Sequence, residues 1–265
     1  MNHYHQPDLL ESILSGLKNA GLNLSSLTRQ DLSGLDEFHL QGASVSLRLA
    51  QKLNLSPENE VLDVGCGIGG PCRMLADEFG CLTTGLDYTA EYIRTAKALS
   101  EMVGLGALTT FVEGNALDLP FATESFDVVW TQHAQMNIAD KTQFYSEIQR
   151  VLKKGGQFLY YDVFQGKKSG LQLPVPWAEV AEDSHLMFHN DLVQHFDKNN
   201  WKRTFSASHT QNAITALERV KAGPLPNLGV NLLMRESTKL KLKNLLQALQ
   251  QDQVEVHAGM YAKLT

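Results

Sequence analysis

The stretch EVLDVGCGIGGPCRMLADEF, residues 60–79, decides the fold class of this chain. Its first five residues form a short apolar run typical of a buried strand, and Pro71 stands in the first turn of a helical pattern, where proline is favoured. Four glycines lie between Gly65 and Gly70. Because glycine permits a tight turn and close approach to the backbone, such a loop between strand and helix predicts a nucleotide-like ligand.

Strands and helices alternate downstream of this loop. The apolar patterns predict strands at 82–86, 109–112, 126–131 and 157–163, with helices at 71–79, 89–102 and 144–152 among them. This order is the signature of βαβ units in an α/β sheet. Further along, the patterns predict a helix around 192–196, a strand at 201–208, a helix at 242–249 and a final strand at 254–262.

Two segments stand outside this alternation. Residues 1–55 include an amphipathic pattern at 9–17 and are predicted to form an N-terminal helical cap segment. Residues from about 165 to 200 contain prolines and break the alternation, so they are predicted to be a cap insertion. We therefore expect one binding domain over 56–265, with both caps over the carboxyl edge of its sheet.

The composition excludes several classes of protein. Of 265 residues, 43% are hydrophobic and 20% charged, as in an ordinary globular protein. The formal net charge of −6 offers no general attraction to nucleic acid or anionic lipid. No run approaches the roughly 18 apolar residues that a membrane span requires, and Asp8 and Glu11 precede Lys18, contrary to a signal peptide. We expect a cytoplasmic protein that acts on a small molecule, without nucleic-acid or membrane partners, and leave its oligomeric state open.

No metal site is predicted. The three cysteines lie between Cys66 and Cys81 without a fourth ligand nearby, and their odd number favours reduced thiols. His185 and His189 have the spacing of a helical metal pair but lack a third ligand, so they are interpreted as two histidines of a cap helix. The basic cluster from Lys239 to Lys243 is interpreted as a solvated helix surface.

Two carboxylates restrict the ligand of the glycine loop. The loop fits the dinucleotide pattern G-x-G-x-x-G, and Asp87 follows Gly67 by 20 residues, where an acid that binds ribose belongs. NAD is therefore one candidate. Asp63, two residues before the first glycine, would repel a pyrophosphate but suits the α-amino group of an amino acid. S-adenosylmethionine carries an amino group, a ribose and an adenine together.

The loop and four further motifs resemble the class I S-adenosylmethionine-dependent methyltransferases. These motifs are Val61 to Gly70, Gly85-Leu86-Asp87, Gly114-Asn115-Ala116 with Leu119-Pro120-Phe121, Phe126-Asp127-Val128-Val129 and Arg150 to Gly156. The resemblance spans residues 60–163 in the family's order. It implies a Rossmann-like, doubly wound, seven-stranded sheet with an antiparallel last strand.

The same resemblance implies S-adenosylmethionine as cofactor. The residues expected to bind it are Asp63, Gly65, Cys66, Gly67, Asp87, Tyr88, Asn115, Ala116 and Gln132. Asn115 stands where the family usually has Asp, and its amide oxygen can still accept from the adenine amino group.

Residues 130–138 and 36–39 are similar to the small-molecule subgroup that includes sarcosine and dimethylglycine N-methyltransferases. Gln132 to Gln135 differ from the tetrad of DNA-adenine methyltransferases. We therefore expect methyl transfer to a small acceptor, with an amine as first choice. The alternatives are a phenol or quinol as acceptor of an O- or C-methyltransferase, and a regulator that binds S-adenosylmethionine without catalysis.

His133 is the candidate general base, because it follows the fourth predicted strand and an amine acceptor must lose a proton. A role limited to hydrogen bonding is equally compatible with its position. Gln135, Met136, Asn137 and Trp177 are candidates for the acceptor site, with loop packing or core burial as the other interpretation. The aromatic rings of Tyr160, Tyr161 and Trp177 could contact a cationic amine, but core burial is the preferred interpretation for each of them separately.

Overall fold

The computed structural model describes residues 8–36, 39–222 and 237–264. Within these residues, seven strands form a sheet in the order β3-β2-β1-β4-β5-β7-β6. The last strand, β7, runs antiparallel to β5 and β6, as predicted. The described residues form two compact units, one with residues 8–36 and 39–120 and the other with residues 121–222 and 237–264.

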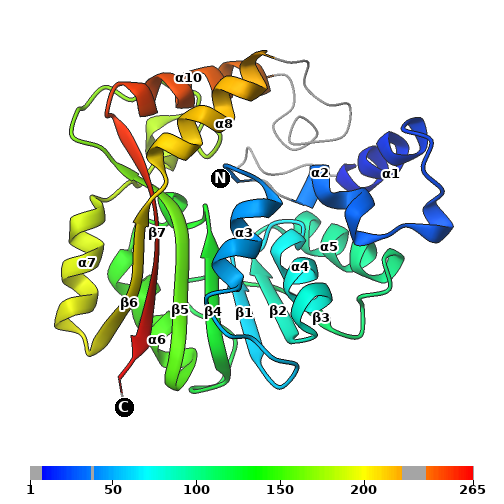
Figure 1. Cartoon of the computed structure of the whole chain (residues 1–265), viewed down its shortest axis with the longest axis horizontal. Coiled ribbons are helices and arrows are strands. Elements are labelled where there is room, and N and C mark those ends of the chain that lie inside the picture. The colour runs from blue at the N-terminus through cyan, green and yellow to red at the C-terminus, as the bar shows by residue number, and fades with distance from the viewer. Residues whose placement is uncertain (1–7, 37–38, 223–236, 265) are drawn as a thin grey trace. The chain divides into compact units, whose positions relative to one another are not determined.

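The first unit contains three parallel strands. They are β1 (Glu60–Val64), β2 (Leu82–Asp87) and β3 (Thr109–Glu113), and the helices between them are α4 (Gly70–Phe79) and α5 (Ala90–Met102) (Figure 1). These bounds lie within one residue of the predicted ones. In the ladder Asp63 is paired with Gly85, so β1 and β2 end side by side at their carboxyl ends.

The N-terminal segment of this unit contains helices, and the first of them covers the amphipathic pattern at 9–17, as predicted. It comprises α1 (Leu9–Asn19), the short helices η2 (Leu24–Ser26) and η3 (Arg29–Leu32), α2 (Ser33–Asp36) and α3 (Ala43–Ala50) (Figure 1). One apolar cluster joins this segment to the glycine loop and to α5, and its members are Leu9, Ile13, Leu17, Leu27, Leu32, Leu35, Ile68, Tyr92 and Leu99. The segment is therefore packed into the first unit through its apolar face.

The second unit contains the other four strands. These are β4 (Phe126–Gln132), β5 (Leu152–Gln165), β6 (Trp201–Ser208) and β7 (Val254–Lys263). Its helices are η4 (Gln135–Asn137), α6 (Lys141–Val151), η5 (Ala181–Asp183), α7 (His189–Lys198), α8 (Thr210–Ala222) and α10 (Thr238–Gln250) (Figure 1). Tyr160 and Tyr161 are fully buried, and Trp177 is 1% exposed, in agreement with the core interpretation.

Three predictions about this unit need correction. The fifth strand begins at Leu152, which pairs with Phe126, whereas the sequence pattern places its start near residue 157. The helix at 210–222 is absent from the predicted elements, because its buried residues are few: Ala213 and Leu217. Lys241 is 4% exposed and its Nζ lies 2.6 Å from Glu179 Oε1, so this lysine is buried and paired with an exposed carboxylate and is not part of a solvated face.

His185 and His189 do not share a helix. His185 lies outside regular structure, whereas His189 is the first residue of α7. The two histidines therefore do not lie one turn apart on a helix, as a helical metal pair would require. The His189 ring stacks on His257 with centroids 3.9 Å apart, and its Nε2 lies 2.8 Å from the Tyr160 hydroxyl.

Candidate functional site

The glycine loop after β1 is a tight turn held by its own backbone. Gly65, Gly67 and Gly69 have φ values of +81°, +54° and +83°, a left-handed region that favours glycine. Gly65 N and Cys66 N donate to Leu86 O at 2.7 and 3.0 Å, so the start of the loop is tied to β2.

Packing around the loop differs from one glycine to the next. A Cβ at Gly69 would lie 2.6 Å from the Phe111 ring, whereas a Cβ at Gly67 would meet no atom of the described residues within 4 Å. Gly67 therefore presents its backbone to open space. This is the geometry that a loop needs if a ligand is to approach its main chain.

Asp87 joins the second strand to this loop. Its Oδ2 accepts a hydrogen bond from Gly67 N at 3.0 Å, and its Oδ1 accepts one from Thr89 N at 2.9 Å. Burial raises the pKa of this carboxyl, against the lowering effect of the two backbone N–H groups. The residue that follows, Tyr88, is 68% exposed. Asp87 is thus held between the glycine loop and the start of α5.

Asp63 is buried at the end of β1, with 1% exposure. The Cys72 thiol lies 3.6 Å from its Oδ2. Burial raises the pKa of the Cys66 and Cys72 thiols well above the usual range, so both stay protonated near neutral pH. All three cysteines are free, as predicted, and these thiols are unsuited to nucleophilic chemistry.

Asn115 and Ala116 follow β3. The side-chain oxygen of Asn115 accepts a hydrogen bond from Leu117 N at 3.0 Å, which forms a local turn. The first unit therefore brings eight of the nine predicted cofactor residues to the carboxyl ends of its three strands. They are Asp63, Gly65, Cys66, Gly67, Asp87, Tyr88, Asn115 and Ala116.

The second unit carries Gln132, the ninth, as the last residue of β4. His133 follows in the left-handed region with φ of +49°, an uncommon conformation for a residue with a side chain. Its backbone N–H donates to Tyr161 O at 2.9 Å, and its ring centroid lies 5.1 Å from that of Tyr161. The backbone of His133 is thus fixed against β5.

A buried carboxylate that sequence reasoning did not select holds the loop after His133. Asp162 is fully buried, and its Oδ2 accepts from Ala134 N and Gln135 N, both at 3.1 Å. Burial raises the pKa of Asp162 to about 7, despite three backbone N–H donors that favour the charged form. An acid inside the apolar run FLYYDVF of β5 is the signal that could have identified it.

Lys141, also absent from the sequence-based set, supports the same loop. Its Nζ donates to Gln135 O at 2.6 Å, to His185 O at 2.7 Å and to Ile138 O. Burial lowers the pKa of this lysine to about 8. Three carbonyl groups of two segments are thereby satisfied by one ammonium.

The four residues predicted to form the site for the methyl acceptor lie close together and are buried. They are Gln135, Met136, Asn137 and Trp177. Asn137 Nδ2 donates to Trp177 O at 2.7 Å, and Trp177 Nε1 donates to Ser184 Oγ at 3.0 Å. Met136 is 4% exposed. The Tyr145 hydroxyl donates to Gln135 Oε1 at 2.5 Å, which leaves the Gln135 Nε2 buried without a hydrogen-bond partner among the described residues.

Two of these residues differ in what their side chains bind. Asn137 connects the loop after β4 to the segment at 165–200 through Trp177 O, whereas Gln135 keeps an unused N–H donor. A buried unsatisfied donor costs about 1–3 kcal/mol, so a ligand that offers an acceptor there would recover this energy.

Among the described residues no helix is long and apolar enough to cross a membrane. Within the same residues no group of three or more His, Cys, Asp or Glu side chains could hold a metal ion.

Known proteins share both the sequence and the fold of this chain. The family model described as "Methyltransferase domain" matches residues 62–160. A glycine/sarcosine/dimethylglycine N-methyltransferase of Actinopolyspora halophila is 36% identical over 115 residues, which are 43% of this chain and 20% of that protein. The chain thus spans well under two thirds of the length of this curated relative.

Two solved structures share the fold. A geranyl diphosphate C-methyltransferase from Streptomyces coelicolor A3(2) superposes with a TM-score of 0.73 and 15% identity over 98% of this chain and 99% of that one. A Haemonchus contortus phosphoethanolamine N-methyltransferase 2 gives a TM-score of 0.72 and 21% identity over 90% and 58%. The family match over residues 62–160 and this shared fold support the resemblance of the chain to class I S-adenosylmethionine-dependent methyltransferases.

Proposed function

We propose that this protein transfers a methyl group from S-adenosylmethionine to a small-molecule acceptor. The observation that carries the proposal is the hydrogen bond between Gly67 N and Asp87 Oδ2, which joins the open glycine loop to the acid at the end of the neighbouring strand. Asp63 lies in β1 and Asp87 ends the adjacent β2, so the carboxyl ends of these strands carry one acid for an amino group and one for a ribose.

Each cofactor residue has a proposed role. Asp63 pairs with the amino group of the cofactor, and the main chain of Gly65 to Gly67 lies against the cofactor. Asp87 accepts hydrogen bonds from the ribose hydroxyls. The open face at Gly67 and the hydrogen bond that places Asp87 beside it support this fit. Asn115 and Ala116 contact the adenine, and Tyr88, Cys66 and Gln132 complete the set.

When bound, S-adenosylmethionine would supply a methyl group: the nucleophile of the acceptor would bond to the methyl carbon in line with the breaking carbon–sulfur bond, and S-adenosylhomocysteine would leave. His133 takes the proton of an amine acceptor in this proposal, since an imidazole has a suitable pKa. Asp162 and Lys141 position its loop through the backbone. The alternative role of His133 is to orient the acceptor or the cofactor by hydrogen bonding alone.

A small polar acceptor is proposed, with an amine as first choice. Gln135 would bind it through its unused Nε2, and Met136 would contribute apolar contact. Asn137 and Trp177 would shape the site by holding the segment at 165–200. The names of the relatives support methyl acceptors of several kinds, including N- and C-methylation, so an O- or C-acceptor is the second candidate.

The remaining assignments are parts of the same proposal. Residues 1–55 and about 165–200 are cap segments, and 56–265 form the catalytic domain. The protein works in the cytoplasm on a small molecule, with no nucleic-acid or membrane partner. A regulator that binds the cofactor without turnover is the alternative from another functional class.

Thermal denaturation with candidate ligands tests the cofactor assignment. S-adenosylhomocysteine at a hundredfold excess over its Kd should add about 2.7 kcal/mol to the free energy of unfolding, and NAD should add nothing. An equal rise in Tm with NAD would refute the assignment. Transfer of labelled methyl groups to panels of amines, phenols and quinols then separates an enzyme from a regulator, which would bind without product.

A further inference from the structure

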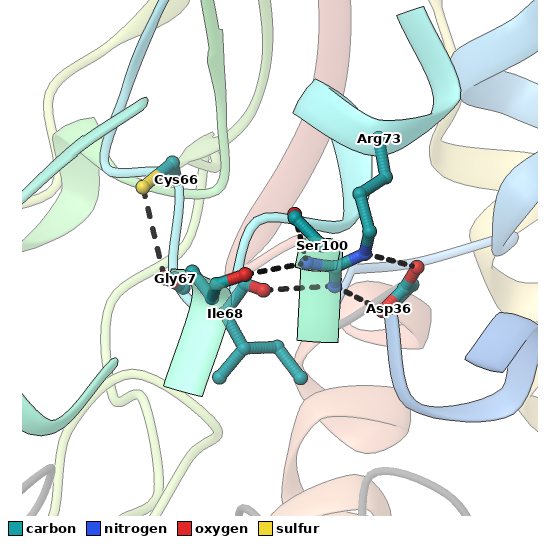
Figure 2. Close-up of polar contacts among 7 residues, drawn as sticks. Asp36, Cys66, Gly67, Ile68, Arg73 and Ser100 are labelled. Carbon is teal, nitrogen blue, oxygen red and sulfur yellow. Dashed lines mark hydrogen bonds and ion pairs between the residues drawn. The ribbon is translucent and has the colours of Figure 1, made fainter. Parts of the chain in front are cut away.

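A buried arginine joins three segments around the glycine loop. Arg73, on α4, is fully buried, and its guanidinium makes five hydrogen bonds (Figure 2). Nε and Nη2 donate to the two carboxylate oxygens of Asp36 at 3.2 and 2.5 Å. Nη2 also donates to Ile68 O at 2.8 Å, and Nη1 donates to Ala96 O and Ser100 Oγ at 3.3 and 3.2 Å.

Such a residue is costly to bury. A guanidinium leaves water at a large free-energy cost unless its charge is paired and its N–H groups are satisfied. Here the pairing carboxylate, Asp36, is itself 4% exposed and comes from α2 of the N-terminal segment. The pair therefore connects that segment to the loop residue Ile68, through one rigid planar group.

Two further contacts link the N-terminal segment to the loop. The side chain of Ile68 is 3% exposed and belongs to the apolar cluster that α1 and α2 form with α5. A Cβ at Gly70 would lie 1.9 Å from Asp36 O, so the backbone of α2 packs directly on that glycine. The segment thus contacts the loop directly at the Ile68 side chain and at the backbone of Gly70, and it reaches Ile68 O through Arg73.

The loop needs this support because its own residues restrain it little. Glycine loses more conformational entropy on folding than any other residue, and the loop has left-handed glycines at 65, 67 and 69. Hydrogen bonds to Leu86 O hold its beginning. Its second half is held by Arg73, which donates to Ile68 O, and by the backbone of α2, which packs on Gly70.

We propose that the segment from Leu9 to Asp36 is a positioning element for the cofactor loop, and that the ion pair between Asp36 and Arg73 transmits its effect. A loop held in its binding conformation binds more tightly, since less ordering remains to be done on binding. The inference rests on the proposed cofactor function. Linkage requires the reverse effect as well: bound cofactor stabilises the N-terminal segment.

The decisive variant is Asp36→Asn, which keeps the shape of the side chain and removes its charge. The matched control is Asp77→Asn. Asp77 Oδ2 lies 2.6 Å from Arg29 Nε, so this pair also connects the N-terminal segment to α4, but at the end of the helix away from the loop. Both variants remove one carboxylate charge from an ion pair between the N-terminal segment and α4, and the control carboxylate is the more exposed, at 45% against 4%.

Calorimetric titration with S-adenosylhomocysteine gives the first measurement. For Asp36→Asn we expect a roughly tenfold increase in Kd, within the usual range of coupling between sites, and for Asp77→Asn a change of less than about twofold. An unchanged Kd in a folded Asp36→Asn variant overturns the proposal, as does an equal increase in the control. If Asp36→Asn does not fold, Ile68→Val replaces it as the test variant, because it removes one methylene and no charge. It should increase Kd by less than the tenfold expected for Asp36→Asn.

Amide hydrogen exchange gives a measurement that needs no ligand. In Asp36→Asn the amides of 67–70 should exchange faster than in the wild type, and in Asp77→Asn they should not. In the wild type, S-adenosylhomocysteine should slow exchange in 9–36. Loop exchange equal in wild type and Asp36→Asn overturns the inference. If the wild type binds no S-adenosylhomocysteine, the proposed function fails, whereas the exchange of 67–70 still decides whether the segment orders the loop.

Discussion

Replacement of Asp87 by alanine should affect both stability and cofactor binding. The carboxylate accepts one backbone N–H on each oxygen, from Gly67 at 3.0 Å and from Thr89 at 2.9 Å. Alanine removes both acceptors, and the N–H of the cofactor loop loses its partner. The same change removes the group proposed to bind the ribose hydroxyls.

The magnitudes follow from these contacts. A hydrogen bond to a charged group contributes about 1.5–3 kcal/mol, but burial of the carboxylate, which raises its pKa, offsets part of this stabilisation. We expect Asp87→Ala to lower the free energy of unfolding by about 2–4 kcal/mol. Loss of the ribose contacts should cost about 1.5–3 kcal/mol of binding, which corresponds to an increase in Kd from about tenfold to a few hundredfold.

Urea denaturation and calorimetric titration with S-adenosylhomocysteine measure the two effects separately. Asp87→Asn should lose about half as much stability, because an amide oxygen can still accept one of the two N–H groups. Asp140→Ala is the control: Asp140 Oδ1 accepts from Gln143 N at 2.9 Å at the start of α6, and its loss should leave Kd unchanged. A folded Asp87→Ala variant with the Kd of the wild type would refute the ribose assignment.

Three further predictions concern the loop after β4 and the packing of the glycine loop. His133→Ala should lower kcat by about 10²- to 10⁴-fold with the cofactor Kd within a few-fold, and the opposite pattern in steady-state kinetics and calorimetry would mean a contact role only. Asp162 has a pKa of about 7 in the folded protein against an ordinary value of 3.8, so the folded state binds the proton more tightly. The free energy of unfolding should therefore fall by about 2 kcal/mol from pH 5 to pH 7, and urea titrations of Asp162→Asn should lack this fall if the assignment holds. Gly70→Ala places a Cβ 1.9 Å from Asp36 O and should cost about 3 kcal/mol, with a clear drop in Tm, whereas Gly21→Ala has open space and should cost only the strain of its φ of +81°; similar Tm values for the two would contradict this packing.

Local sequence patterns were sufficient for most of the framework. The run at 60–64, the alternation at 254–262 and the apolar face at 9–17 each correspond to an observed element. These patterns suffice because strand and helix periods depend on residues two to four positions apart. The glycine loop and Asp87 were also identifiable, since tight turns and strand ends have strong residue preferences.

The support of the site could not be identified in this way. Asp36 and Arg73 are 37 residues apart, and nothing in the local pattern around either residue marks them as a pair. Asp162 lies 28 residues from Ala134, whose N–H it accepts, and Lys241 is buried against Glu179 although it stands in a polar stretch. Each of these charges is placed by contacts between distant segments.

The division has a physical reason. Secondary structure and turns follow from the steric and hydrogen-bonding preferences of neighbouring residues. The sequence by itself therefore determined the βαβ order and the tight glycine turn after the first strand. Whether a buried charge is paired depends on the low dielectric and the partner that folding brings to it. Only the tertiary structure therefore decided that Arg73 backs the cofactor loop and that Asp162 holds the loop of His133.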